Sequence, residues 1–214
     1  MGHVGRSRRG GGGELSQTHR DPPDDDWIEW LFADGSGIWD LFVVVFYLPV
    51  IMGALLWLHT QGGEWLLWTR LIGEQPAWDA SVGGVVGVGL VAASMFGERT
   101  PAGARAAAVL SDHMGRVSWA GIVAVASTSA LGEELFFRGF LQQTVGIGMA
   151  SLLFAAVHVP FRFDLWPWTV QAFLHGLLLG YAYELSEALV VPIVAHSVFN
   201  GAQLVRWKVR VLST

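Results

Sequence analysis

The chain has 214 residues, of which 52% are hydrophobic and only 14% are charged. A soluble domain carries about 25% charged residues, and ten of the charged residues here fall within the first 29 positions. The remainder is too poorly charged to cover a water-soluble surface, so we expect an integral membrane protein in contact with the lipid bilayer. The absence of cysteine excludes disulfides and a cysteine nucleophile. A net charge of −5 with a single lysine, Lys208, argues against nucleic acid as a partner.

The N-terminal segment is polar and of low complexity. Residues 1–26 hold several arginines, then the run Gly10–Gly13, then acidic residues. This composition cannot bury an apolar core, and it lacks the apolar stretch of a cleavable signal peptide. We expect a disordered tail at 1–26, then N-terminal transmembrane helices and an interfacial segment at 27–116. A transmembrane core at 117–206 and a short basic tail at 207–214 complete the expected organisation.

Apolar stretches later in the chain predict membrane helices, which typically need about 20 residues. The predicted spans are Ile38–His59, Ala80–Phe96, Val117–Leu141, Val145–Val159, Trp166–Tyr183 and Ala188–Val205. Between the first two, the Trp and Leu residues of 61–80 favour an interfacial helix, whereas Gly97–Arg116 predicts a polar loop. The expected fold class is all-α, a polytopic transmembrane helix bundle of about six spans.

The basic residues fall on one side of this arrangement. With six spans, both ends of the chain and the loops at 97–116 and 160–167 lie on the same side of the membrane. That side holds Arg6, Arg8, Arg9, Arg20, Arg99, Arg105, Arg116, Arg162, Arg206, Lys208 and Arg210. The opposite side holds only one basic residue, Arg70. Cytoplasmic loops carry an excess of Lys and Arg. We therefore expect both termini in the cytoplasm and the protein in the cell (plasma) membrane.

Three clusters of polar residues interrupt the apolar core segment. They are Glu133–Arg138, Phe154–His158 and His196–Asn200. Ionisable groups at membrane depth cost at least about 2.5–3.5 kcal/mol each on insertion scales, so they usually face an interior cavity and carry function. Together the clusters supply carboxylates, two imidazoles and an amide, which are the groups needed to activate a water and stabilise an oxyanion.

Helical spacing distinguishes the two acids. Glu134 and Arg138 are four residues apart, with the acid on the N-terminal side, which favours an ion pair. Glu133 lies about 100° round the helix and lacks this partner, so it stays available as a general base or acid. The alternative is a purely structural network of two acids and an arginine.

The histidines have structural alternatives of their own. Phe154 and His158 lie on one helix face, and a histidine beside a helix end often packs or caps. His196 and Asn200 also share a face, where they could bind a metal, form an oxyanion hole or make an interhelical hydrogen bond. His175 is a weaker candidate that helix packing explains as well.

A serine nucleophile is a further alternative. Ser127, Thr128 and Ser129 precede the acid pair, but no histidine nearby is placed to activate them and the surrounding sequence is not of the GxSxG type. Small hydroxyl residues at such positions commonly pack helices.

The three clusters resemble the CPBP family of intramembrane proteases, which comprises CAAX prenyl protease 2 and bacteriocin-processing proteins and is also called ABI. The family pattern EExxxR, FxxxH, HxxxN corresponds here to Glu133-Glu134-xxx-Arg138, Phe154-xxx-His158 and His196-xxx-Asn200, in that order. Gly139 and the stretch LLLGYAYE before the last motif are also similar. The resemblance covers roughly residues 117–205, and it marks the core expected at 117–206 as catalytic.

The resemblance implies hydrolysis of a peptide bond within the membrane. Glu133 would activate the water with help from His158, and His196 and Asn200 would stabilise the oxyanion. Glu134 and Arg138 would orient the site or hold the C-terminal end of the substrate. The implied substrate is a membrane-anchored protein or peptide with a CAAX-like end, a leader or a C-terminal tag.

The resemblance leaves the type of protease open between glutamic and metallo-dependent. If a metal is used, Glu133, His158 and His196 are the expected zinc ligands, with Asn200 supporting them. We favour the metal-free assignment, which requires no cofactor, because an acid pair with its own arginine already forms a base and its orienting partner.

Two other classes of function compete with a protease. Intramembrane Glu, His and Arg also serve proton-coupled transporters, although no inverted repeat is visible in the 214 residues. A non-catalytic immunity or scaffold membrane protein is the other alternative. The protease hypothesis also has a geometric requirement, because six simple spans would leave Glu133 and His158 about 10 Å apart in depth. The two can meet only if the third helix is long and tilted, or is broken near Gly132 or Gly139.

Overall fold

The computed structural model describes residues 36–159, 162 and 165–213. The disordered tail expected at 1–26 lies outside these residues. The described chain is helical, without a strand in the part that the structure describes. Its elements are α2 (Ser36–Ile72), α3 (Pro76–Gly97), α4 (Pro101–Met114), α5 (Trp119–Glu134), the π-helical segment η1 (Leu135–Leu141), α6 (Gln142–Val157), α7 (Trp166–Ser186) and α8 (Val190–Leu212).

The exterior of the molecule is strongly apolar. Leu56, Val85 and Val123 are 65%, 75% and 69% exposed on three different helices, as expected for side chains that face lipid rather than water. Among the described residues, three helical segments are long and apolar enough to cross a membrane, namely Asp40–Ile72, Pro76–Gly97 and Trp119–Val157. The helical membrane bundle is confirmed, whereas the count of six spans and the side of the termini stay predictions.

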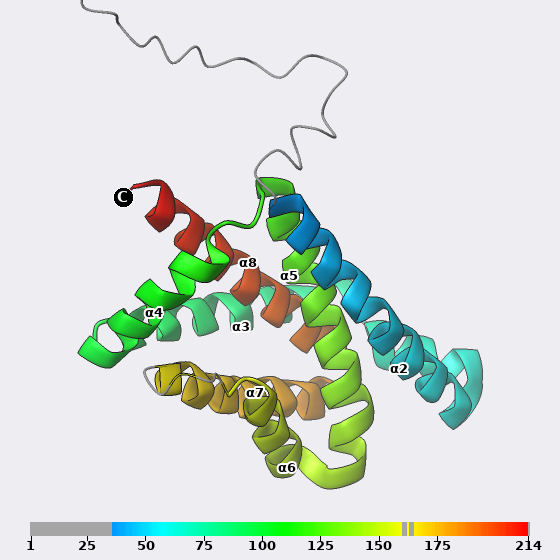
Figure 1. Ribbon diagram of the computed structural model, residues 1–214. Coiled ribbons are helices and arrows are strands. Elements are labelled where there is room, and N and C mark those ends of the chain that lie inside the picture. The colour runs from blue at the N-terminus through cyan, green and yellow to red at the C-terminus, as the bar shows by residue number, and fades with distance from the viewer. Residues whose placement is uncertain (1–35, 160–161, 163–164, 214) are drawn as a thin grey trace, which may run out of the picture.

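The first two helices include the segment expected to lie at the interface. Helix α2 continues past the predicted span to Ile72, with a bend at Gly62 and Gly63, and Gly63 has φ +72°. Figure 1 shows α2 lying alongside α5. Helix α3 packs against α8 through Gly83 and Gly87, where an added Cβ would approach backbone oxygens of α8 to 2.5 and 2.7 Å. Small residues let helix backbones approach closely in membranes.

The prediction of a polar loop at Gly97–Arg116 is wrong for most of its length. Helix α4 occupies Pro101–Met114, and the side chain of its N-cap residue Thr100 accepts a hydrogen bond from the Gly103 N–H. A capping hydroxyl, a proline at the first position and an alanine-rich body all favour a helix. The loop was predicted because the segment contains several arginines, although these residues are compatible with a helix.

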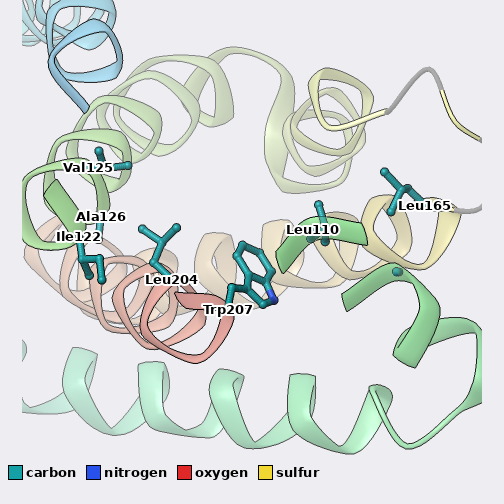
Figure 2. Close-up of a cluster of buried hydrophobic side chains, with 8 residues drawn as sticks. Leu110, Ile122, Val125, Ala126, Leu165, Leu204 and Trp207 are labelled. Carbon is teal, nitrogen blue, oxygen red and sulfur yellow. The ribbon is translucent and has the colours of Figure 1, made fainter. Parts of the chain in front are cut away.

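Helix α4 joins the bundle through a buried apolar cluster. Leu110 of α4, Ile122 of α5, and Leu204 and Trp207 of α8 lie together in it, as Figure 2 shows. Trp207 is buried and α8 runs on to Leu212, so most of the tail expected at 207–214 is helical.

The chain reverses between α5 and α6, and this reversal positions the site. A straight helix would separate Glu133 from His158 by about 37 Å at 1.5 Å per residue. The chain passes through η1 and then turns at Gly146, where φ is +77° and ψ is 165°. Figure 1 shows α6 returning beside η1, below α5. Gly132 and Gly139 were the positions considered for a break, as the alternative to a long, tilted helix. The non-helical backbone is instead at Gly146, whose positive φ favours glycine.

Candidate active site

Glu133 lies on the wall of an apolar cavity of about 650 Å³ between the helices. Its side chain is 13% exposed, at the last turn of α5. The Tyr47 hydroxyl of α2 donates a hydrogen bond to Oε1. Oε2 is buried, and among the described residues no donor reaches it. One carboxylate oxygen is therefore anchored and the other is available for chemistry.

Glu134 faces away from the cavity into a buried ion-pair network. It is 0% exposed, and its Oε1 accepts from Arg138 Nη1 at 2.9 Å and from His196 Nδ1 at 2.7 Å. The Arg138 side chain, 2% exposed, also donates to the Gly176 carbonyl oxygen at 3.1 Å and lies over the Phe154 ring, 4.9 Å from its centroid. The ion pair expected from the four-residue spacing is present, and it holds α5, η1, α7 and α8 together.

His158 follows the last turn of α6 and is held on two sides. Its Nδ1 lies 2.7 Å from the Phe154 carbonyl oxygen, which can only accept, so Nδ1 carries a proton. Its ring stacks on Phe154 at 4.5 Å between centroids, and Trp168 lies edge-on at 5.5 Å. The remaining nitrogen, Nε2, lies 3.9 Å from Glu133 Oε2.

His196 and Asn200 come from one face of α8. Because His196 Nδ1 donates to Glu134, its Nε2 is directed towards Glu133 and lies 3.9 Å from Oε2. The Asn200 amide donates to Ser129 Oγ of α5 at 3.2 Å. Both side chains line the cavity. An amide has two N–H donors, so Asn200 keeps a second donor besides the one that Ser129 receives.

The structure thus brings the three sequence clusters to one place. Glu133, His158, His196 and Asn200 line the same cavity, whereas Glu134 and Arg138 lie behind it. A gap of 3.9 Å is too long for a direct hydrogen bond and is suited to a bridging water. A water there would meet one carboxylate oxygen and two ring nitrogens, a set of groups that can hold a nucleophile by hydrogen bonds.

The serine alternative gains no support from the geometry. Ser129 Oγ donates to the Ala126 carbonyl oxygen at 3.4 Å and accepts from Asn200, and no histidine in the described residues bonds to it. Among the weaker candidates, His175 lines the cavity and packs edge-on against Phe199 at 4.3 Å.

The sequence analysis did not identify Tyr47, and it considered Ser129 as a nucleophile or a helix-packing residue but not as a partner of Asn200. Tyr47 is a polar side chain inside the first predicted span, Ile38–His59. Its depth was a usable signal, because polar groups inside membrane helices usually have a partner. The partner is 86 residues away, so no local pattern identifies it.

Glu133, His158 and His196, the residues considered as zinc ligands, lie close together, but the distances between their side-chain atoms are longer than at a zinc ion. Zinc bonds of about 2.0–2.2 Å at tetrahedral angles place ligand atoms about 3.4 Å apart, whereas Glu133 Oε2 is 3.9 Å from each histidine Nε2. Among the described residues, no group of three His, Cys, Asp or Glu side chains is arranged to hold a metal ion. These distances do not fit a bound zinc ion.

Part of the sequence is similar to known proteins. Residues 115–202 match the family described as type II CAAX prenyl endopeptidase Rce1-like. The chain is also 40% identical over 73 residues to the uncharacterized protein YpbD of Bacillus subtilis. That match covers 34% of this chain and 38% of the relative's length. No solved structure matches the chain.

The fold and site define an integral membrane helix bundle with carboxylates, imidazoles and an amide gathered at an apolar cavity. Residues 115–202, less than half of the chain, match this family model, and over that segment the predicted resemblance to the CPBP (ABI) family of intramembrane proteases is confirmed. The matched segment contains all seven residues of the three motifs, whereas Tyr47 lies outside it.

Proposed function

We propose that the protein is a glutamate-dependent intramembrane endopeptidase. The single observation that supports this most strongly is the convergence of Glu133 Oε2 with Nε2 of both His158 and His196, 3.9 Å from each, at the cavity wall. A carboxylate that is unpaired at one oxygen and faces a polar gap is suited to general base catalysis.

In the proposed reaction, a water sits between Glu133 Oε2 and His158 Nε2. Glu133 takes a proton from this water while the water oxygen forms a bond to the scissile carbonyl carbon. His158 accepts a hydrogen bond from the other proton and so fixes the attacking direction. When the C–N bond breaks, Glu133 returns the proton to the leaving nitrogen, which balances protons over the cycle.

The oxyanion would be stabilised by Asn200 and His196. Preorganised donors aimed at the developing charge are usually the largest contribution to acyl transfer. Asn200 offers an amide N–H. Because His196 Nδ1–H is committed to Glu134, His196 can donate from Nε2 only as an imidazolium. Glu134 and Arg138 act in this scheme as positioning residues, since both lie behind the cavity wall.

The cavity favours a substrate with an apolar segment beside the scissile bond. Phe46, Leu90, Leu110 and Leu174 from four helices line it with the polar residues. We propose a membrane-anchored protein or peptide as the substrate, with a CAAX-like end, a leader or a C-terminal tag as the classes to test. The enzyme would lie in the cell membrane with both termini in the cytoplasm, as the arginine distribution favours.

The test is cleavage of a panel of membrane-anchored peptides by the purified full chain in detergent. Glu133→Gln keeps an acceptor for Tyr47 and should lower kcat at least about 10²-fold. Glu64→Gln makes the same change at an exposed position of α2 and should leave kcat unchanged. The same reactions are run with and without 1,10-phenanthroline.

Cleavage that is lost in Glu133→Gln and unaffected by the chelator would support a glutamic protease. Loss with the chelator and recovery with zinc would show a metalloprotease instead. If no peptide is cleaved while Glu133→Gln abolishes solute or proton flux in proteoliposomes, the protein is a transporter and the proposal is wrong.

A further inference from the structure

Among the described residues, Tyr47 is the one hydrogen-bond or ion-pair partner of Glu133 from outside the segment that matches the family. It lies on α2, half-buried on the cavity wall, and its hydroxyl donates to Glu133 Oε1 across 86 positions of the chain. The contact joins an N-terminal helix directly to the residue proposed as the base.

The backbone beside Glu133 is shaped to admit this tyrosine. At Gly132 an added Cβ would stand 2.5 Å from Tyr47 Cδ1 and 3.2 Å from Cγ. The absence of a side chain at 132 therefore lets the ring lie against α5, so that the hydroxyl reaches the next residue. Gly132 was one of two glycines considered for a break in the helix, but it lies within α5, which continues to Glu134.

The hydrogen bond selects which carboxylate oxygen is reactive. A carboxylate rotates about its terminal bond unless a partner holds it. With Oε1 held by Tyr47, Oε2 is the oxygen that lies 3.9 Å from both His158 and His196. Without the hydroxyl, either oxygen could turn away from the two rings.

We infer that Tyr47 is a positioning residue that holds the Glu133 carboxylate with Oε2 directed at the two histidines, so that α2 completes the active site. This inference rests on the proposed function. Tyr47 does not contact the scissile bond in this scheme, and it affects only the orientation of Glu133. The rate of the chemical step should therefore depend on the hydroxyl, while substrate affinity should not.

The test compares Tyr47→Phe with Tyr181→Phe in the peptide-cleavage assay, using the full chain. Tyr47→Phe keeps the ring against Gly132 and removes the oxygen alone, so the variant should still fold. A hydrogen bond to a charged group is strong enough for its loss to lower kcat roughly ten- to hundredfold, with KM unchanged. Tyr181, 56% exposed on α7, undergoes the same chemical change and should keep the wild-type kcat.

Gly132→Ala supplies a second perturbation that leaves the hydroxyl in place. It should push the ring away from α5 and lower kcat in the same way, with KM again unchanged. Equal kcat values for Tyr47→Phe and the wild type would overturn the inference. So would a raised KM with unchanged kcat, because the hydroxyl would then contact the substrate.

Glu133→Gln in the same assay tests the proposed function separately from the positioning role of Tyr47. If Glu133→Gln still cleaves, the proposed function is wrong. If Glu133→Gln is inactive while Tyr47→Phe cleaves at the wild-type rate, the proposed function stands and the positioning role of Tyr47 alone is wrong.

Discussion

Removing the Arg138 guanidinium should destabilise the protein far more than removing an arginine from a partly exposed ion pair. Arg138 is 2% exposed and its partner Glu134 is 0% exposed. The substitution Arg138→Met keeps much of the aliphatic volume and deletes the charge. Glu134 then keeps His196 as its remaining hydrogen-bond partner in the bundle interior.

The expected cost follows from the burial of the pair. Breaking a buried ion pair by removing one partner costs about 3–5 kcal/mol, because an uncompensated charge is left behind. For a chain of 150–250 residues, each kcal/mol lowers the thermal midpoint by about 2–4 °C. Arg138→Met should therefore unfold about 6–20 °C below the wild type.

The control is Arg206→Met in the pair of Arg206 with Glu98. These side chains are 30% and 17% exposed, and Nη2 lies 2.7 Å from Oε2. Ion pairs that water reaches contribute about 0–1 kcal/mol, so the midpoint should fall by no more than about 4 °C. Thermal unfolding in one detergent, followed by tryptophan fluorescence, measures both variants under identical conditions.

A double variant tests the physical cause. In Arg138→Met with Glu134→Gln, both charges are gone while an amide oxygen still accepts from His196, so at least half of the lost stability should return. The reasoning is refuted if Arg138→Met loses no more stability than Arg206→Met, or if the double variant is less stable than Arg138→Met. Either result would mean that Arg138 does not stabilise the protein by neutralising the buried charge on Glu134.

Three further outcomes follow from the site and the fold. Asn200→Ala should lower kcat by about 10²–10³ with little change in KM, and a raised KM at constant kcat would assign Asn200 to substrate binding. Ser129→Ala should still hydrolyse peptide, and complete inactivity in a folded sample would restore the serine nucleophile. Gly146→Ala should lose about 1–3 kcal/mol of stability, since its backbone conformation (φ +77°, ψ 165°) is essentially restricted to glycine. The matched change Gly148→Ala, in an open helical position, should be neutral or stabilising by up to about 1 kcal/mol. Equal midpoints for these two glycine variants would argue against a strained turn.

Local spacing was sufficient to predict several features of this protein. The low charge outside the N-terminal segment predicted a membrane protein, because lipid-facing helices need no polar surface. The four-residue spacing of Glu134 and Arg138 predicted their ion pair and set Glu133 apart, since helix geometry places residues four apart on one face. The three motifs likewise predicted the family that residues 115–202 match.

Long-range packing decided the rest. No periodicity shows that the chain reverses at Gly146, yet this turn brings His158 to within 3.9 Å of Glu133. The arginines at 97–116 suggested a loop, while the cap at Thr100 and burial against Trp207 produced a helix. Tyr47 became a partner of Glu133 only because α2 packs on α5 at a glycine. Sequence determined which chemical groups are present and which helix face each occupies, because those depend on neighbours a few residues away. Tertiary structure decided which groups meet, because that depends on packing between segments up to 86 residues apart.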